Sequence, residues 1–352
     1  MIKKLAGRII RDAGDSFELW RKQENSRKEA IEICRQVTEQ KGHSVMTHSL
    51  KKKIKSYCKK NFGSSRYWPW IVLYTEIRGE YKEGWVPDDY YKHVLAEKLN
   101  KPSSPLLSAL KSFDHRIFPG FAVKPIFVKI GKNYFNADGR VLNSAELSDI
   151  ISSHSGELVV KRDSGPSGTA VTFIDASIFD ISTHLSKHYN YVIQPAVEQH
   201  PAIAEVYDKS VNTLRVVTLI KPGGSIGVLV VFMRFGVNGS RLDNIMTGGR
   251  FVAINQDGTL EGKAYDRLGL YQGETQPDTG FHFAGLKVPS YRQAIQQCIY
   301  SHTLYPYNRL IAWDVYINTD EEPRLIEWNS LPGLWRYEAV FGPLWDSSIL
   351  AF

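Results

Sequence analysis

Two carboxylates and an amide recur at regular spacing in two runs of alternating apolar and polar residues near the end of the chain. The runs span 310–318 and 324–329, and a turn-like segment joins them. If the hairpin is centred in the middle of this turn, Asp314 falls directly opposite Glu327, with Cβ atoms roughly 4.5–5.5 Å apart. Asn329 points to the same face as Glu327, because strand side chains repeat every second position. The pattern predicts three convergent oxygen donors.

This trio predicts a magnesium site. Like charges that face each other destabilise a sheet unless something neutralises them, and a hard divalent cation with oxygen ligands does so. Magnesium fits Asp314, Glu327 and Asn329 best, since it needs few protein oxygens and keeps water and phosphate as further ligands. The alternative is a solvated hairpin face with three polar side chains. Trp313 and Trp328 favour the metal site, because their place on the opposite face indicates a buried and tightly registered hairpin.

A strand, a small-residue loop and a returning strand form a second constellation, at 158–171. Lys161 ends the first strand and supplies a point charge. Backbone N–H groups can approach one anion where side chains are small, as they are at Ser164, Gly165, Ser167 and Gly168. The pattern predicts a cover over a phosphate group. It matches neither common phosphate-loop motif, and an ordinary hairpin loop is the alternative.

A third constellation places two arginines within apolar strands, at 210–218 and 231–236. Burying an arginine is costly without an anionic partner. With the hairpin centred after Gly224, Arg215 and Arg234 face each other, which implies a shared phosphate or substrate carboxylate. Ion pairs with nearby acids on an exposed sheet face are the alternative. The residues that follow are either turn residues or a backbone nest for the same anion: Asp243, Asn244, Gly248 and Gly249.

These side chains require a framework of short strands from about residue 120 onward, where Gly, Pro and Asn separate β-type runs. We expect strands at 122–129, 157–161, 169–174, 191–194, 211–220, 226–235, 251–255, 309–317 and 324–329. We expect helices at 144–153, 176–188 and 289–302. The pattern predicts an α+β architecture with many hairpins for the C-terminal two thirds of the chain.

The N-terminal third has a different texture and carries the excess of positive charge. The spacing predicts a basic amphipathic helix over 2–12, a charged helical stretch over 17–41 and a second basic helix near 49–61. The first helix suggests contact with a membrane surface, and the alternative is an ordinary helix docked on the body. The formal charge is +7, but residues 1–66 hold 17 Lys and Arg against 7 Asp and Glu. The remaining residues are slightly acidic, so nucleic acid is not the expected partner.

Composition also limits the location of the protein. The hydrophobic fraction of 43% and the charged fraction of 23% are typical of a folded protein. No apolar run approaches the roughly 20 residues that span a bilayer. Arg8 and Arg11 interrupt the N-terminal apolar stretch, so a signal peptide is not expected. Three widely spaced cysteines favour the reducing cytoplasm, because they form neither a disulfide framework nor a CxxC zinc pair.

Taken in order, the motifs resemble those of the ATP-grasp superfamily, and most closely its sugar-transfer-associated family. The resemblance covers about residues 100–335. It rests on the Asp, then Glu-x-Asn set behind a Lys-bearing strand and a Gly/Ser loop, and on four further stretches: 192–201, 211–215, 243–249 and 326–329.

The resemblance implies a role for each matching residue. Lys161 would contact ATP phosphates, and the 164–168 loop would fold over them. Arg215 and Arg234 would hold the transferred phosphoryl group or the acceptor carboxylate. Asp314, Glu327 and Asn329 would hold two magnesium ions. The family's earlier lysine has three competing matches, Lys111, Arg116 and Lys124.

The nucleotide base would lie at the strand end from Gln194 to Val197, including Pro195. Gln194 stands where many relatives have Glu. Glu198 or Glu205 would reach the ribose. Asn244 belongs to the expected nucleotide-binding set. The implied fold is two α+β subdomains that clasp ATP behind a helical N-terminal region, with divisions at 1–120, 121–197 and 198–352.

The implied activity is an ATP- and magnesium-dependent carboxylate–amine ligase that acts through an acylphosphate. The sequence leaves the carboxylate and amine unnamed; the family name suggests surface polysaccharide biosynthesis, with a sugar uronate and an amino compound. A kinase on the same scaffold, acting on a sugar or small-molecule hydroxyl, is the alternative. A nucleotide-binding partner subunit without turnover is a third reading, against which the intact Asp/Glu/Asn set counts. A peripheral position at the inner face of the membrane is also left open.

Overall fold

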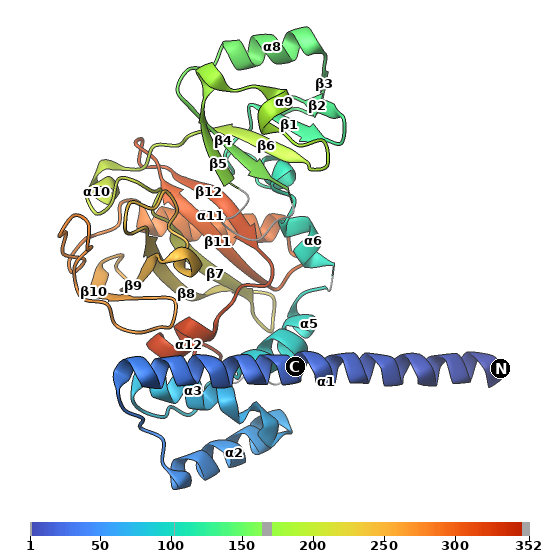
Figure 1. Cartoon of the computed structure of the whole chain (residues 1–352), viewed down its shortest axis with the longest axis vertical. Helices are drawn as coiled ribbons and strands as arrows, with labels where there is room; N and C mark the ends of the chain where they lie inside the picture. The colour runs from blue at the N-terminus through green and yellow to red at the C-terminus, as the bar shows by residue number, and fades with distance from the viewer. Residues whose placement is uncertain (1, 102, 164–170, 347–352) are drawn as a thin grey trace. The chain divides into compact units, whose positions relative to one another are not determined.

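The computed structural model describes residues 2–101, 103–163 and 171–346, with side chains from residue 18 onward. These residues form two compact units, shown in Figure 1. The helical unit takes its described residues from 1–99, 268–270 and 333–352, and the two-sheet unit takes its own from 100–267 and 271–332.

The helical unit surrounds an aromatic core. Trp70 lies at the centre, fully buried, and its ring is 5.8 Å from that of Trp335. The C-terminal segment therefore completes the core of the N-terminal helices. The elements are α1 (Ile2–Lys41), α2 (His48–Phe62), a 3-10 turn η1 (Ser65–Tyr67), α3 (Trp68–Arg78), α4 (Asp88–Tyr90), a π-helical turn η2 (Tyr91–Leu95), α5 (Ala96–Leu99) and α12 (Trp335–Phe341).

The first sheet of the two-sheet unit is antiparallel, in the order β3-β2-β1-β6-β4-β5. Short helices and turns lead into it: α6 (Ser104–Ser108), η3 (Lys111–Phe113) and α7 (Asp114–Ile117). Its strands are β1 (Phe127–Ile130), β2 (Asn133–Phe135), β3 (Val141–Leu142), β4 (Glu157–Arg162), β5 (Val171–Asp175) and β6 (Tyr191–Pro195). With α8 (Ser144–Ser152), η4 (Ala176–Ile178) and α9 (Ile181–His184), they enclose a separate hydrophobic core around Phe127, Leu147 and Ile193.

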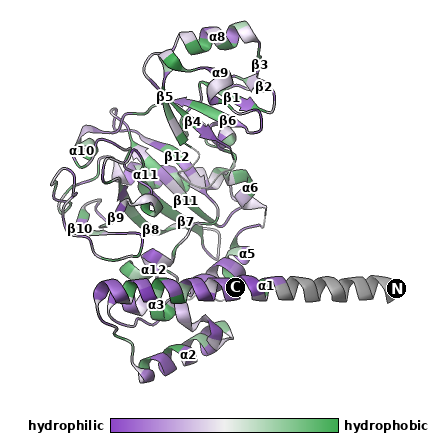
Figure 2. Cartoon of the chain, in the orientation of Figure 1, coloured by the Kyte–Doolittle hydropathy of each residue, from purple (hydrophilic) through white to green (hydrophobic). Residues whose placement is uncertain are grey.

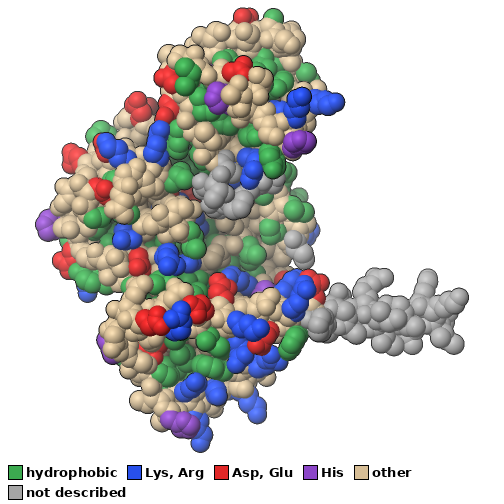
Figure 3. All heavy atoms as spheres, viewed as in Figure 1, with side chains coloured by type: hydrophobic (Ala, Val, Ile, Leu, Met, Phe, Trp, Pro, Cys, Tyr) green, Lys and Arg blue, Asp and Glu red, His purple; other side chains and the backbone are tan. Residues whose placement is uncertain are grey.

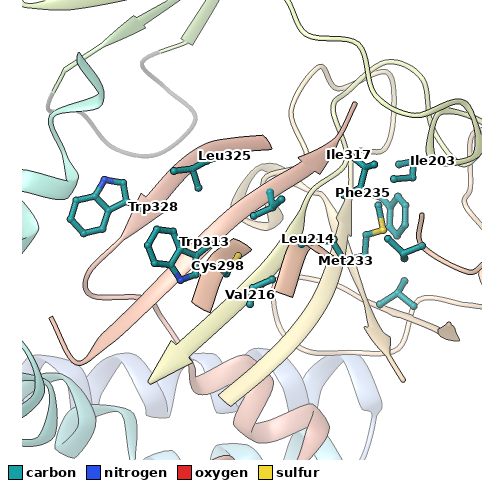
Figure 4. Close-up of a cluster of buried hydrophobic side chains, with 14 of the residues drawn as sticks. Ile203, Leu214, Val216, Met233, Phe235, Cys298, Trp313, Ile317, Leu325 and Trp328 are labelled. Carbon is teal, nitrogen blue, oxygen red and sulfur yellow. The ribbon is translucent and has the colours of Figure 1, made fainter. Parts of the chain in front are cut away.

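The second sheet is also antiparallel, in the order β10-β9-β8-β7-β11-β12. After the short α10 (Pro201–Ala204), its elements are β7 (Leu214–Ile220), β8 (Ile226–Phe235), the turn η5 (Ile245–Thr247), β9 (Arg250–Ile254), β10 (Leu260–Tyr265), α11 (Tyr291–Leu304), β11 (Leu310–Ile317) and β12 (Pro323–Asn329). Helix α11 packs its Ala294 and Cys298 into the core on one face of this sheet (Figure 4).

Alternation along the strands separates a core face from a polar face. Leu214 and Val216 belong to the core, as do Met233 and Phe235. The residue between each pair is an arginine, so both arginines point away from α11. In β11 the core residues Trp313 and Val315 flank Asp314 in the same way, whereas in β12 a bulge at Ile326 interrupts the alternation between the core residues Leu325 and Trp328. The sheet thus gathers charge on the face opposite its helix.

The sequence predicts most of this architecture. The α+β class with paired strands agrees with the structure, and β8 has the expected bounds. The strands at β2, β3 and β10 were missed because they are short or interrupted by glycine. The helix expected at 176–188 is wrong, since the segment forms only η4 and α9. The division at 1–120, 121–197 and 198–352 stays a prediction.

We expect the C-terminal core to set stability. Ile317 is fully buried in it, so Ile317→Ala should lower the free energy of unfolding by about 2–5 kcal/mol. Ile178 is 69% exposed, and Ile178→Ala removes the same atoms from a solvated position. Thermal and urea unfolding of the two variants should separate them clearly. Equal losses of stability would contradict the position of the core.

Candidate functional site

The β11–β12 hairpin brings the two predicted carboxylates together. Asp314 pairs directly with Glu327, as the sequence predicts. A bulge follows at once, because Val315 pairs with Leu325 and leaves Ile326 without a partner in β11. Bulges are common beside functional sites, where they redirect a side chain. The turn is one residue shorter than expected, and the bulge adds one residue to β12. The two differences cancel, so Glu327 still lies opposite Asp314.

Asp314 is held by two arginines from neighbouring strands. Its carboxylate accepts hydrogen bonds from Arg215, from Nε to Oδ1 and from Nη2 to Oδ2 at 2.8 Å. Arg234 Nη2 lies 2.9 Å from Oδ2. The Asp314 side chain is only 3% exposed, so these ion pairs are shielded from solvent. The charges of the two arginines hold the pKa of Asp314 below its ordinary value against the effect of burial.

The expected register of the two arginines is wrong. Arg215 pairs with Phe232 rather than with Arg234, because the turn between the strands is centred on Gly223 and a bulge adds a residue in β8. The shift is two residues, so both side chains still lie on the same face. The alternative of ion pairs with acids is what the structure shows, although on a buried face rather than an exposed one.

Thr213 and Asp243 complete the surroundings of Arg234. The Thr213 hydroxyl accepts from Nη2 of Arg234 at 2.7 Å and donates to Asp243 Oδ2. The backbone N–H of Thr213 also donates to that oxygen, at 3.1 Å. Burial raises the pKa of Asp243, and Arg234 opposes this effect. Sequence reasoning assigned Asp243 to a turn or a nest, but its side chain orients the arginine.

Lys161 lies at the end of β4 and is buried. Burial lowers its pKa to about 8, while the charges of Glu327 and Asp114 raise it. Glu327 in turn has a raised pKa, through burial and the charge of Asp314, and Lys111 lowers it. The lysine of the first sheet and the carboxylates of the second therefore share one electrostatic environment.

Residues 111–114 link the two sheets, and sequence reasoning missed this link. Asp163, two residues after Lys161, accepts from the Ser112 N–H at 3.0 Å and from the Ser112 hydroxyl at 2.6 Å. Asp114 accepts from Trp328 Nε1 at 2.8 Å. Burial raises the pKa of Asp114 to about 8. The sequence gives no local signal for this link, because both acids bind residues that are distant in the chain.

Of the three competing cations in this region, Lys111 acts on the site. Its charge acts on Lys161, Asp114 and Glu327. Arg116 instead covers Gly139, where a Cβ atom would meet its guanidinium. Lys124 is 73% exposed and lies 3.9 Å from Asp138. The structure therefore favours Lys111 by position.

The other residues expected to contact the nucleotide differ in their exposure to solvent. Gln194 is buried and its Nε2 donates to the Val123 carbonyl at 2.8 Å, so its amide already serves the fold. Pro195, Glu198 and Glu205 are exposed, and Val197 is half-buried. The cover-loop residues Ser164, Gly165, Ser167 and Gly168 lie outside the described residues.

Two amide side chains have clear structural partners. Asn244 accepts from the Met246 N–H at 2.9 Å and caps η5. This arrangement places Gly248 at a φ of 110°, which favours glycine. Asn329 accepts from the Leu331 N–H at 3.0 Å and pairs across the hairpin with Ala312. Asn329 keeps its expected position on the strand, two residues beyond Glu327.

A protein-family model identifies the family of the chain. The model of the sugar-transfer associated ATP-grasp family matches residues 106–343, which is more than half of the chain. The chain belongs to this family. The match spans the 111–114 segment, Lys161 and both carboxylates, so the ATP-grasp resemblance expected from the sequence is confirmed. The comparison with curated proteins gave no match.

Several solved structures are similar to the chain at low identity. VanG D-Ala:D-Ser ligase from Enterococcus faecalis is 13% identical, with 70% of this chain and 60% of that one covered and a TM-score of 0.41. The ADP complex of N5-carboxyaminoimidazole ribonucleotide synthetase is 13% identical, with 65% and 47% covered and a TM-score of 0.39. The D-alanine–D-alanine ligase from Coxiella burnetii is 10% identical, with 73% and 58% covered and a TM-score of 0.37. The chain spans about half to three fifths of the length of these structures.

The donor set of this ATP-grasp protein fits magnesium. Asp314 and Glu327 face each other on a partly buried surface. The arginines neutralise Asp314, but burial and the charge of Asp314 still raise the pKa of Glu327, so a cation beside Glu327 would relieve this repulsion. No cluster of three or more His, Cys, Asp or Glu side chains occurs among residues 18–101, 103–163 and 171–346. Asn329 would therefore supply the third oxygen, as magnesium with further water and phosphate ligands allows.

The buried ion pair should be strongly coupled. Arg215→Ala leaves Asp314 partly unpaired and should cost about 3–5 kcal/mol, whereas Arg215→Ala combined with Asp314→Ala should cost less than the two single changes together. Urea unfolding of the four proteins measures the coupling energy. The exposed pair Arg35–Glu39 is the control, and its coupling should stay below about 1 kcal/mol. Similar coupling in both pairs would contradict the buried geometry.

Proposed function

We propose that this ATP-grasp chain is an ATP- and magnesium-dependent ligase that joins a carboxylate to an amine through an acylphosphate. The observation that carries the proposal is the polar face of the second sheet, where Asp314 and Glu327 oppose each other beside two arginines. Lys161 adds a buried cation whose charge interacts with Glu327. Family membership supports ATP as the phosphoryl donor and the ligase class of enzyme.

The reaction has two balanced steps. A carboxylate oxygen of the substrate attacks the γ-phosphorus of ATP, the bond to the bridging oxygen breaks, and ADP leaves. The amine nitrogen then attacks the acyl carbon, phosphate leaves with the bonding electrons, and the nitrogen loses one proton. Such chemistry needs positioning and charge neutralisation more than a protein nucleophile. The cations of this site supply both.

Each side chain has a separate task in this scheme. Lys161 binds phosphate oxygens from the first sheet, and Lys111 does so from the 111–114 segment. Arg215 and Arg234 orient the transferred phosphoryl group or the acceptor carboxylate, while Asp314 fixes their guanidinium groups. When bound, magnesium held by Asp314, Glu327 and Asn329 would neutralise phosphate oxygens of ATP. The expected number of two ions stays a prediction.

The nucleotide base would lie against the backbone after β6, near Pro195 and Val197, since Gln194 is engaged with Val123. Glu198 or Glu205 would reach the ribose, and both are exposed. Asn244 would contribute through the η5 turn that it caps. These assignments follow the family resemblance.

The substrate proposal is a sugar uronate joined to an amino compound during surface polysaccharide synthesis, in the cytoplasm. Its support is the description of the matched family as sugar-transfer associated. None of the described helices has the length and apolar content needed to span a bilayer. Peripheral contact of residues 2–12 with a membrane belongs to the same proposal.

We expect ADP and phosphate release only when a carboxylate and an amine are both present. Hydroxylamine should replace the amine and trap the acyl group as a hydroxamate, because an acylphosphate reacts with it readily. A panel of uronic acids against amino acids, followed by coupled ADP detection and mass spectrometry, measures both outcomes. AMP as the product would contradict the proposal. A phosphorylated product that is stable to hydroxylamine would identify the kinase instead.

Removing either carboxylate should abolish turnover. Asp314→Asn and Glu327→Gln should each lower kcat at least ~100-fold, since each weakens charge stabilisation at the phosphates. Asp320→Asn is the control, because Asp320 lies exposed in the turn of the same hairpin. Full ADP release by either site variant would contradict the magnesium assignment. Thermal unfolding checks that each variant is folded.

A further inference from the structure

The outward surface of α2 is a dense block of lysine side chains. Its 15 residues include six lysines and no Asp, Glu or Arg. Figure 2 shows the helix as largely hydrophilic, and Figure 3 shows Lys and Arg side chains grouped over it. Neither the ligase chemistry nor the two-sheet unit uses this surface.

Packing fixes the direction of these lysines. Ile54, Cys58 and Phe62 recur every four residues and are buried, so they attach one side of α2 to the helical unit. Thr47 caps the N-terminus of the helix by accepting from the Leu50 N–H, and Gly63 ends it in the left-handed region. The lysines lie around the rest of the helix; we call the exposed Lys52, Lys55 and Lys59, which share one flank, the lysine face, with Lys51, Lys53 and Lys60 beside them.

No described carboxylate neutralises the lysine face. Among the side chains from residue 18 onward that the structure places, no ion pair joins an α2 lysine to an acid. Two acids of the same helical unit have other partners: Glu24 pairs with Arg27 and Arg66, and Glu80 pairs with Arg78 and Lys82. The positive charge of the face is therefore available to an external anion.

Aromatic side chains border the lysine face. Lys51 Nζ lies 4.3 Å from the centroid of the Trp68 ring, and Lys55 Nζ lies 5.5 Å from it. In the same helical unit Arg66 lies over the ring of Trp20, which is 45% exposed. Tryptophan beside basic residues is typical of surfaces that meet the headgroup region of a bilayer.

We infer that the lysine face of α2 binds the surface of a membrane that contains anionic lipids. A convex helix with lysines, and without arginine, suits diffuse attraction to a charged plane rather than bidentate recognition of single phosphates. The helix also has no Gln or Arg to read base edges, and Asn61 donates to the Tyr57 carbonyl of the helix itself at 3.0 Å. The described helices have no membrane span, so this contact would be peripheral.

Vesicle sedimentation with the full-length chain tests this inference. The protein should bind vesicles of phosphatidylcholine with one third phosphatidylglycerol and not vesicles of phosphatidylcholine alone. Lys52→Gln, Lys55→Gln and Lys59→Gln combined should lower the vesicle affinity at least ~10-fold, since each lysine near an anionic surface contributes about fivefold. Raised salt should weaken binding by the wild type, because screening shortens the range of the attraction.

A second triple variant controls for net charge. Lys132→Gln, Lys187→Gln and Lys263→Gln combined remove the same charge from exposed positions of the two-sheet unit, and vesicle affinity should stay within about twofold of wild type. Equal loss in both triple variants, or binding to neutral vesicles, would overturn the inference. Loss of binding only when residues 1–12 are deleted would assign the contact to the N-terminal helix, and binding to duplex DNA but not to vesicles would assign it to nucleic acid.

Discussion

The structure depends on one shared carboxylate. Asp314 lies buried between Arg215 and Arg234 and opposite Glu327, so four charges meet on one face of a sheet. Such a group is costly to remove from water unless its members are paired and correctly oriented. Four adjacent strands, β8, β7, β11 and β12, bring the residues into contact, and the core packed on α11 holds those strands in register. The chemistry of the site thus requires these four strands of the second sheet.

The segment 111–114 extends this constraint to the first sheet. Ser112 binds Asp163 near the end of β4, and Asp114 binds the indole of Trp328, which lies next to Glu327 in β12. A movement of β4 would therefore displace the hairpin that carries the carboxylates, because the 111–114 segment is bonded to both. This coupling gives a physical reason for the shared electrostatics of Lys161 and Glu327.

The sequence predicted the site where apolar and polar residues alternate along a strand. It was less informative where a β-bulge sets the strand register or where a buried acid binds a distant residue. It predicted the opposition of Asp314 and Glu327 and the burial of Trp313 and Trp328, because the shorter turn and the bulge at Ile326 offset each other and leave the predicted pairing unchanged. It misplaced Arg215 against Arg234, since neither the tighter turn nor the bulge in β8 has a residue signature. Asp114 and Asp163 were missed because their partners are distant in the sequence.

The central claim is that the carboxylate pair holds magnesium for ATP, and calorimetry tests it most directly. Binding of the non-hydrolysable analogue AMPPNP is measured with magnesium and with EDTA, for wild type and for Glu327→Gln. We predict at least ~10-fold tighter binding with magnesium for wild type, and no such gain for the variant, because one ligand oxygen has lost its charge. An equal gain in both proteins, or none in wild type, would contradict it.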